Sequence, residues 1–390
     1  MRIRHHIIQN CVAIFVSLAA AWGCKDPYVS PYKSPVTGYL VVEGYISGNS
    51  ISQFMLSRTI SLPGDSTLPT ENGATVLIQG SDNSSYPLTG TGNGVYTTGD
   101  TLKLNTQLQY RLSIKTGNGA QYLSDFVPFK PTPPIDSINW VENGDYSIQI
   151  YANSHDPANN THYYQWNFDQ TYEYHSAETS EDYWDKDTVP PALEGRSPAQ
   201  QVYRCWQSGV STNVIIGNST KLASDVIYRQ PVKYIPPSDV QSSVLYSILV
   251  RQYALTADGY NFLSLMQQNT ESLGSIFDAQ PSQITGNIHN VTNPAEQVIG
   301  WVSAGTVQSQ RIFIAREQIL STYSTSCPIP DTLFTDASQY PMDYGQGLFT
   351  PMYFGMNRAG QKGEISNYTD CLVCTIAGGV NVAPPFWPKP

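Results

Sequence analysis

Residues 93–116 read NGVYTTGDTLKLNTQLQYRLSIKT, and this stretch decides the fold class. Runs rich in Val, Tyr, Leu and Ile, which favour β-strands, are separated here by Gly, Asn and Asp, which favour turns. Three further runs of the same kind precede it, at residues 39–47, 52–60 and 74–80. Short strands at this spacing are typical of a β-sandwich, so we expect an N-terminal β-sandwich domain over residues 38–130.

A proline-rich stretch separates this domain from the rest of the chain. Residues 128–137 read PFKPTPPIDS, which predicts a stiff junction. Residues 131–390 are expected to form a larger β-rich domain, because the chain carries 26 Tyr, 29 Gly and 27 Pro but only 13% charged residues. One or two short helices are expected within it. The clearer one is at residues 257–272, where apolar side chains recur at helical spacing.

The N-terminus has the three parts of a secretory signal. A basic start is followed by a nearly uncharged apolar run at residues 11–21, and small residues precede Cys24. The run is shorter than the roughly 20 residues of a membrane span. A cysteine directly after the small residue distinguishes a lipoprotein signal from an ordinary one, because its thiol receives a diacylglycerol. We expect residues 1–23 to be removed, Cys24 to be lipidated and residues 24–37 to form a tether; a plain secreted protein is the alternative.

The predicted mature chain is strongly acidic. Residues 1–23 contain two of the 21 basic residues and no acid, which leaves 19 basic against 31 acidic residues. Such a chain is a poor partner for nucleic acid and is repelled by anionic lipid, so acyl chains must hold it at the bilayer. Lys25 and Asp26 resemble in part the export signal of Bacteroidota surface lipoproteins. We expect an outer-membrane protein that faces the cell surface, although the sequence leaves the face of the membrane open.

Four further cysteines follow the lipidation site. An even number in an oxidising compartment favours disulfides. Cys371 and Cys374 form a CxxC pair, but neither a second CxxC nor a nearby His completes a zinc site. The disulfide candidates are Cys205, Cys327, Cys371 and Cys374. Three pairings are possible, and the sequence does not choose among them.

Three passages resemble a family of Bacteroidota outer-membrane lipoproteins, the domain of unknown function 4249. They are LVVEGYIS at residues 40–47, SIFDAQPSQITGNIHNVTNPAEQVIGWVSAGTVQSQRIFI at residues 275–314, and CLVCTIAGGVNVAPPFW at residues 371–387. The resemblance implies a protein often encoded beside a TonB-dependent transporter, and the family has no established catalytic residues. Residues 93–116 also resemble the last strands of transthyretin-like, Ig-like sandwiches, a likeness that implies no activity.

A search for chemistry finds no common catalytic motif. The sequence contains no HExxH, no GxSxG and no phosphate-binding loop, so we expect no enzyme, no cofactor and no metal site. A glycosidase needs only two carboxylates, and acidic pairs are plentiful. A hydrolase with a carboxylate pair therefore stays as the weakest hypothesis.

Residues 162–187, HYYQWNFDQTYEYHSAETSEDYWDKD, are the richest local group of aromatic and acidic side chains. Alternation predicts that residues 163–168 are core. Residues 172–187 alternate poorly and are acidic, which predicts an exposed loop that contacts a ligand or partner, with calcium as a weaker alternative. The candidate contact residues are Tyr172, Tyr174, Asp182, Trp184, Asp185 and Asp187.

Two later segments are candidates for contacts. Residues 340–360 combine aromatic residues, Met and Gly, which suits either an adaptable contact surface or a folded loop. In the tail PPFWPKP, Phe386 and Trp387 are expected to fasten the end of the chain to the body. Five Asp-Ser/Thr-apolar tripeptides resemble the acceptor for O-glycosylation in Bacteroidota envelope proteins. The predicted acceptors are Ser66, Thr101, Ser137, Thr188 and Thr332.

Three functional hypotheses follow. The first is a non-catalytic, lipid-anchored accessory subunit of a TonB-dependent transporter, acting in ligand capture, gating or assembly. The second is a free-standing surface protein for glycan binding or adhesion. The third is the carboxylate-based hydrolase. The identity of the ligand is left open.

Overall fold

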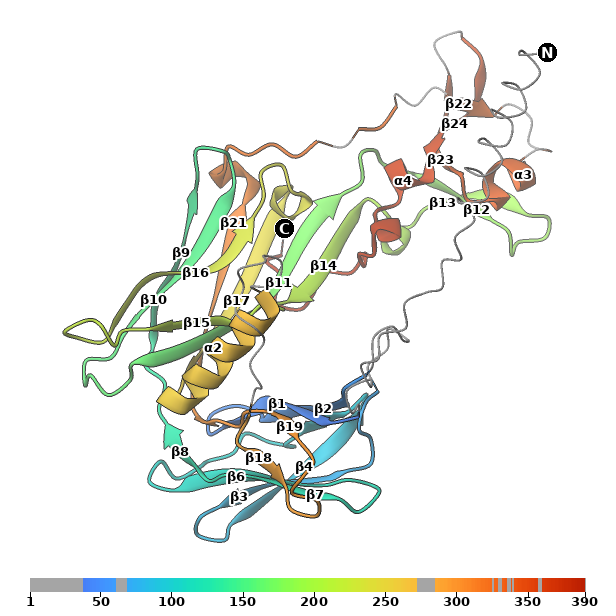
Figure 1. The fold of residues 1–390 in the computed structure, drawn as a ribbon. Coiled ribbons are helices and arrows are strands. Elements are labelled where there is room, and N and C mark those ends of the chain that lie inside the picture. Colours follow the sequence, from blue (N-terminus) through green and yellow to red (C-terminus); the bar gives the residue numbers. More distant parts are fainter. Residues whose placement is uncertain are drawn as a thin grey trace, which may run out of the picture.

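The computed structural model describes residues 38–60, 69–271, 285–324, 326–328, 332–334, 338, 340–356 and 360–389. Within these ranges the chain is mostly β and has three parts: an N-terminal closed sheet, a body of two sheets, and a small lobe that projects from the body (Figure 1). The predicted signal, the tether with Cys24, and Ser66 lie outside the described residues. No helix among the described residues is long and apolar enough to cross a membrane.

Strands from distant parts of the chain complete the N-terminal sheet. Among the described residues, eight strands close in the order β6, β3, β4, β5, β2, β1, β20, β8, because β6 pairs with both β3 and β8. The short strand β20 joins β1 to β8 through parallel pairings. The strands of this sheet are β1 (Leu40–Ser47), β2 (Gln53–Arg58), β3 (Thr75–Gly80), β4 (Ser85–Gly92), β5 (Val95–Thr97), β6 (Gln109–Lys115), β7 (Gln121–Ser124), β8 (Val127–Lys130), β18 (Ile288–Asn290), β19 (Val298–Gly300) and β20 (Ala304–Gly305).

The first hydrophobic core lies inside this closed sheet. Alternation turns Tyr110, Leu112 and Ile114 of β6 inward, and all three are buried. Ile288 and Val298 pack into the same core, so this late segment belongs to the N-terminal unit and not to the second domain that the sequence suggested. The observed sheet also closes on itself, where a sandwich was expected. An alternating pattern specifies which face of a strand is buried but not which strands pair at the edges.

The body contains a three-stranded and a five-stranded sheet. The first has the order β16, β10, β9, and the second has the order β14, β11, β17, β21 with β15 also paired to β11. Their strands are β9 (Ile135–Glu142), β10 (Ile148–His155), β11 (Tyr163–His175), β14 (Arg204–Val210), β15 (Ile215–Asn218), β16 (Val226–Ile235), β17 (Leu245–Ala254) and β21 (Val307–Ala315). Three short 3-10 turns flank these strands: η1 (Pro198–Gln200) precedes β14, η2 (Val240–Ser242) joins β16 to β17, and η3 (Arg316–Gln318) follows β21.

The second core lies in the body and follows the predicted alternation. Tyr164, Trp166 and Phe168 are buried, which confirms residues 163–168 as core. Alternate residues of β17 are buried in the same way. The predicted helix is also confirmed, as α2 (Ala257–Glu271). Its Phe262 ring packs 5.7 Å from the ring of Trp301.

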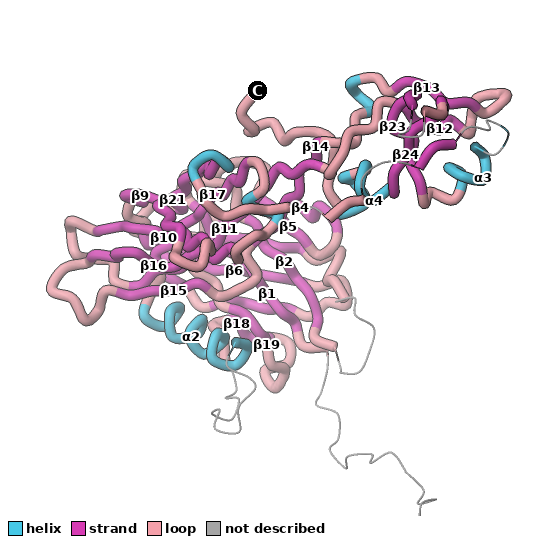
Figure 2. The backbone as a smooth tube through the Cα atoms, turned by 90° about the horizontal axis from the view of Figure 1, so that it is seen from above, coloured by secondary structure: helices cyan, strands magenta, loops and turns pink. Residues whose placement is uncertain are grey.

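The third part, which we call the distal lobe, extends away from the body in both views (Figures 1 and 2). It consists of a two-stranded sheet, a three-stranded sheet and two short helices. These elements surround a small core that contains Met352, Ile365 and Leu372. Its elements are β12 (Asp182–Asp185), β13 (Ala192–Gly195), β22 (Thr332–Phe334), α3 (Tyr340–Gly345), β23 (Phe349–Met356), β24 (Lys362–Tyr368) and α4 (Thr369–Leu372), and η5 (Cys374–Ala377) leads back to the body.

Two disulfides confirm that all four cysteines are bonded, as expected. Cys205 of β14 is bonded to Cys374, and Cys327 is bonded to Cys371. Cys205 and Cys374 are buried within the core of the body. The two cysteines of the CxxC pair therefore bond to different partners rather than to each other.

Candidate functional site

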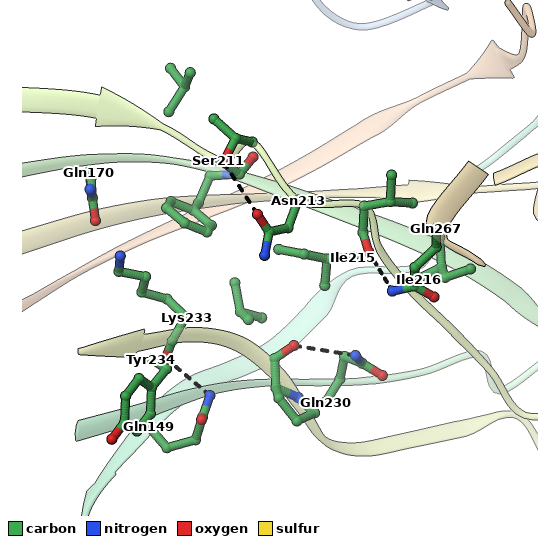
Figure 3. A pocket seen from close by; sticks show the side chains of 16 residues that line it. Gln149, Gln170, Ser211, Asn213, Ile215, Ile216, Gln230, Lys233, Tyr234 and Gln267 are labelled. Atoms are coloured by element: carbon green, nitrogen blue, oxygen red, sulfur yellow. Dashed lines mark hydrogen bonds between the residues drawn. The ribbon is translucent and has the colours of Figure 1, made fainter. Parts of the chain in front are cut away.

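A cleft of about 520 Å³ opens in the body between β16 and the edge formed by β15 and the loop after β14 (Figure 3). Strands β10 and β11 and helix α2 also contribute to its walls. In the described part of the chain, the lining is mainly polar and contains no Asp or Glu. Five side-chain amides surround it: Gln149, Gln170, Asn213, Gln230 and Gln267.

Lys233 is the one charged residue among the described residues of this lining. Its ammonium lies 5.9 Å from the centre of the Phe168 ring, a cation–π contact. Burial lowers the pKa of Lys233, an effect that Asp239 partly opposes. Gln149 of β10 donates a hydrogen bond of 3.0 Å to the carbonyl oxygen of Lys233 in β16.

Two of the predicted contact residues are buried. Tyr172 and Tyr174 lie in β11 and belong to the second core, so the expectation of an exposed loop is wrong for this part of residues 172–187. Tyr172 donates to Gln207, and Tyr174 donates a bond of 2.7 Å to the carbonyl oxygen of Cys374. β11 continues through this segment because β14 and β17 cover both of its edges.

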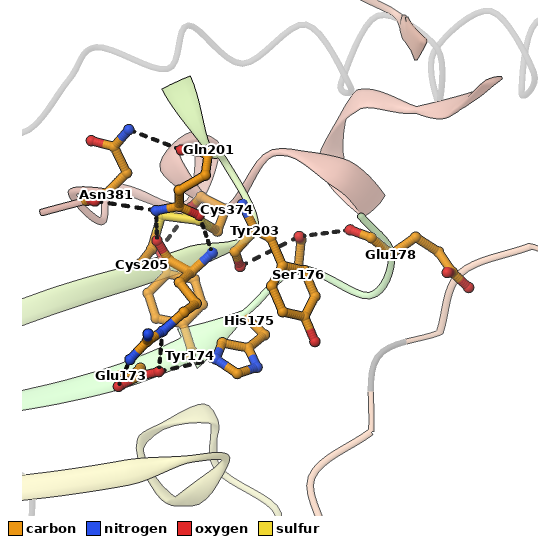
Figure 4. Close-up of a disulfide and its surroundings, with 11 residues drawn as sticks. Glu173, Tyr174, His175, Ser176, Glu178, Gln201, Tyr203, Cys205, Cys374 and Asn381 are labelled. Carbon is orange, nitrogen blue, oxygen red and sulfur yellow. Dashed lines mark hydrogen bonds and ion pairs between the residues drawn. A yellow bond between two sulfur atoms is a disulfide. The ribbon is translucent and has the colours of Figure 1, made fainter. Parts of the chain in front are cut away.

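Glu173, between these tyrosines, is the centre of a buried charge cluster near the Cys205–Cys374 disulfide (Figure 4). Arg204 binds both of its carboxylate oxygens, at 2.8 and 3.1 Å, and His175 contacts it at 3.0 Å. The Trp387 indole donates to it at 3.0 Å. Burial alone raises the pKa of Glu173, but the bonds from His175, Arg204 and Trp387 outweigh burial and hold the pKa at about 2. The cluster fastens the C-terminal segment, as predicted for Trp387.

The other predicted contact residues lie in the distal lobe. Asp182, Trp184 and Asp185 belong to β12, and Asp187 follows it at an exposed position. The Trp184 ring lies 6.2 Å from that of Tyr340 and 6.3 Å from that of Tyr344. The fold thus brings two segments together that the sequence presented separately, residues 182–187 and residues 340–356.

The distal lobe exposes several large apolar side chains. Phe354 and Met356 are 68% and 57% exposed, and they point to the same face of β23 because they are two residues apart. Further exposed apolar or aromatic residues of the lobe are Met342, Leu348, Tyr353 and Tyr368. Apolar side chains exposed together are typical of surfaces that bind a protein or a membrane.

One carboxyl group of the lobe is buried, and no ion pair to it is formed by the described residues. Glu364 of β24 is 1% exposed, and its Oε1 atom has no hydrogen-bond partner among the described residues. Burial, with a smaller contribution from the negative charge of Asp182, raises the pKa of Glu364 to about 7. Burial also raises the pKa of Asp182.

Comparison with known proteins identifies the family. The family model described as domain of unknown function DUF4249 matches residues 25–311. The chain belongs to this family. No curated protein matches it. The matched range contains every residue that lines the cleft, whereas β22, β23 and β24 of the distal lobe lie beyond it.

Solved structures add only distant likenesses. The chitinase ChiA74 from Bacillus thuringiensis is 12% identical, with 48% of this chain and 30% of that chain covered at a TM-score of 0.14. The BSP domain of a biofilm-associated protein is 8% identical, with 75% and 62% covered at a TM-score of 0.16. The DUF4249 chain thus spans less than two thirds of either structure. At such TM-scores neither likeness bears on fold or function.

A buried polar network in the body brings a serine, a histidine and an aspartate together. Asp225 accepts hydrogen bonds from Tyr164 and Ser219, and His162 Nδ1 lies 3.2 Å from Ser219 Oγ. A catalytic triad places the histidine between serine and carboxylate, whereas here the carboxylate binds the serine directly. This network therefore holds β11 to the start of β16. Among the described residues, no group of three or more His, Cys, Asp or Glu side chains is arranged to hold a metal ion.

The predicted glycosylation sites differ in accessibility. Thr101 is exposed, whereas Ser137 and Thr188 are half-buried. Ser137 accepts bonds from two asparagine amides, and Thr188 donates to the carbonyl oxygen of Asp185. Thr332 lies in β22. Modification at these positions stays a prediction.

The residues that line the cleft were missed by sequence reasoning. They come from five separate segments, and amide residues such as Gln149 and Gln267 are common on any polar surface. The sequence signal that could have drawn attention to them is local: residues 209–218 and 226–235 contain no acid in a chain with 31 acidic residues.

Proposed function

We propose that this protein is a non-catalytic, lipid-anchored binding subunit of the bacterial outer membrane, where it captures a ligand and works beside a TonB-dependent transporter. Membership of the DUF4249 family and the signal before Cys24 support this role. Two or three acyl chains, at about 0.8 kcal/mol for each buried methylene, would hold the protein durably at the bilayer. In this proposal the anchored protein lies on the cell-surface side of the outer membrane.

The observation that carries the proposal is the exposed apolar pair on the distal lobe. Phe354 and Met356 belong to a part that projects from the body, on the side away from the sheet of β9, β10 and β16 that borders the cleft (Figures 1 and 2). Burying apolar surface stabilises association by about 25 cal/mol per Å² before the costs of binding. A partner can thus dock on the lobe while the cleft stays open to a ligand.

The second candidate is a free-standing glycan-binding or adhesion protein. The amide-lined cleft favours it, because side-chain amides offer both donors and acceptors to sugar hydroxyls. This candidate needs no partner on the distal lobe. The predicted O-glycosylation is compatible with either role at the cell surface.

Co-purification distinguishes the two candidates. The native outer membrane is extracted with a mild detergent, the C-terminally tagged protein is purified, and the proteins that accompany it are quantified by mass spectrometry. The subunit proposal expects a TonB-dependent transporter in near-equal amount after a high-salt wash, because an apolar contact is not screened by salt. Recovery of the lipoprotein alone would reject the stable complex and favour the free-standing protein.

A further inference from the structure

The cleft of the body differs in charge from the rest of the protein. The full chain has a formal net charge of −10, yet the described residues that line the cleft include Lys233 and no carboxylate. Among the described residues, no carboxylate forms an ion pair with the Lys233 ammonium. Burial without a counter-ion is costly for a cation, and an anionic group in the cleft would offset that cost.

The amides around Lys233 have unused hydrogen-bonding groups. The Oε1 atom of Gln170 accepts from Tyr246 at 2.9 Å, which fixes the side chain and leaves its NH₂ group without a partner among the described residues. Asn213 likewise accepts from Thr212 and has a free NH₂ group within the described chain. A side chain that is already held in place, like that of Gln170, loses little entropy when a ligand binds.

Acceptors are available on the other walls. The Nε2 atom of Gln149 is bound to the Lys233 carbonyl and that of Gln267 to the Val214 carbonyl, at 3.0 and 2.8 Å. Their Oε1 atoms have no hydrogen-bond partner in the described part of the chain, and the same is true of Gln230 Oε1. The lining thus offers donors on β11 and on the loop after β14, and acceptors on β10, β16 and α2 (Figure 3), a combination that matches a ligand whose hydroxyl groups both donate and accept.

The strand beside the cleft is poorly suited to a peptide. Among the described strands β16 is an edge strand that pairs with β10 alone, and an extended peptide would have to add to its other edge. Pro231 lacks an N–H group, and the register of the pairing shifts between Pro231 and Lys233. Proline and bulges oppose strand addition.

We propose that this cleft binds a saccharide that carries a carboxylate, with Lys233 as the partner of the carboxylate and the surrounding amides as partners of the hydroxyl groups. The inference rests on the proposed role in ligand capture and names the class of ligand. The cleft volume of about 520 Å³ lies within the roughly 300–1,000 Å³ typical of ligand sites.

Calorimetric titration of the intact mature protein in detergent tests this proposal. The probes are trisaccharides of galacturonate, glucuronate and mannuronate, with neutral maltotriose and a tri-glutamate peptide for comparison. At least one uronate is expected to bind more tightly than maltotriose, and its affinity should fall as salt rises. Equal binding of maltotriose, preference for the peptide, or no binding of any uronate would each overturn the proposal.

Variants of the cleft make the test specific. Lys233→Gln should weaken uronate binding by about 10- to 100-fold, the value of a hydrogen bond to a charged group, and Lys233→Arg should retain most of it. Lys221→Gln removes an exposed charge outside the cleft and should have no effect. Asn213→Ala, at an exposed position, serves as a second variant that leaves the core intact. Unchanged binding in both Lys233→Gln and Asn213→Ala would refute the site.

The outcome separates this inference from the proposed function. If the protein co-purifies with a transporter but binds no uronate, the assignment of the ligand fails and the subunit role stands. If it binds a uronate in the cleft but co-purifies with no transporter, the subunit role fails and the assignment of the ligand stands.

Discussion

The indole nitrogen of Trp387 donates a hydrogen bond of 3.0 Å to the carboxylate of Glu173, a residue 214 positions earlier in the chain. The Trp387 ring also packs edge-on against Trp206 and Phe313, at centroid distances of 6.5 and 5.8 Å. The C-terminal segment therefore packs on the body and covers the buried carboxylate of Glu173.

Removal of Trp387 should destabilise the body. Trp387→Ala deletes a buried ring and leaves Glu173 with one donor fewer, so a loss of about 3–5 kcal/mol in the free energy of unfolding is expected. Urea denaturation followed by circular dichroism measures it. Phe386→Ala is the matched control, since its ring is 41% exposed above Arg311, and should cost much less. Equal losses in the two variants would show that Trp387 does not fasten the tail.

Acid should weaken the Glu173 cluster. The folded pKa of about 2 lies below the unfolded value of 4.5, so the stabilisation is complete above about pH 4.5 and is lost as the pH falls towards 2. The shift corresponds to about 3 kcal/mol at neutral pH. Glu173→Gln should therefore be more harmful at pH 7 than at pH 2.5, as measured by urea denaturation at both values. The exposed Glu43→Gln should show no such difference, and a pH-independent cost of Glu173→Gln would contradict the account.

Glu364 should have the opposite pH dependence. Its folded pKa of about 7 lies above the unfolded 4.5, so the folded lobe is most stable below about pH 4.5 and loses stability as the pH rises through 7. Glu364→Gln keeps the shape and removes the buried charge. Thermal unfolding should show this variant to be more stable than the wild type at pH 8, by up to about 3 kcal/mol, and similar to it at pH 4. If Glu364→Gln were less stable than the wild type at pH 8, a neighbouring group would have to stabilise the ionised carboxylate of Glu364, which contradicts the account.

The two disulfides should contribute to different parts of the molecule. They close loops with sequence separations of 169 and 44 residues, for which chain entropy predicts about 5 and 4 kcal/mol. Replacing Cys205 and Cys374 with Ser should lower the unfolding free energy of the body, because both are buried in its core. Replacing Cys327 and Cys371 should mainly make the distal lobe more sensitive to limited proteolysis. The structure would be contradicted if replacing Cys327 and Cys371 lowered the unfolding free energy of the body while replacing Cys205 and Cys374 mainly made the distal lobe sensitive to proteolysis.

Local patterns in the sequence predicted local structure well. The helix at residues 257–271 and the buried face of residues 163–168 follow from spacing alone, because one face of each element packs on the core. The bonding of all four cysteines followed from their even number and the expected compartment. The pairing could not be predicted, because it depends on how the distal lobe folds back onto β14.

Features that depend on distant parts of the chain were missed. The closed sheet requires β20, a strand of two residues that no periodicity can reveal, to pair with β1 and β8. Tyr172 and Tyr174 are buried because β14 and the C-terminal segment cover them, whereas their acidic surroundings suggested exposure. The cleft likewise arises from side chains of five segments. Such sites follow from the topology and not from any motif.

The measurement that tests the central claim most directly is the ratio of transporter to lipoprotein recovered from detergent-extracted outer membranes. It compares the wild type with two double variants. Phe354→Ser with Met356→Ser alters the exposed pair of the distal lobe, and Leu222→Ser with Val291→Ser alters residues of similar exposure, 57% and 52%, outside it. The account predicts a near-equal ratio for the wild type and the control pair, and loss of the transporter from the lobe variant. Recovery of the transporter with the lobe variant at the wild-type ratio, or its absence from all three, would contradict it.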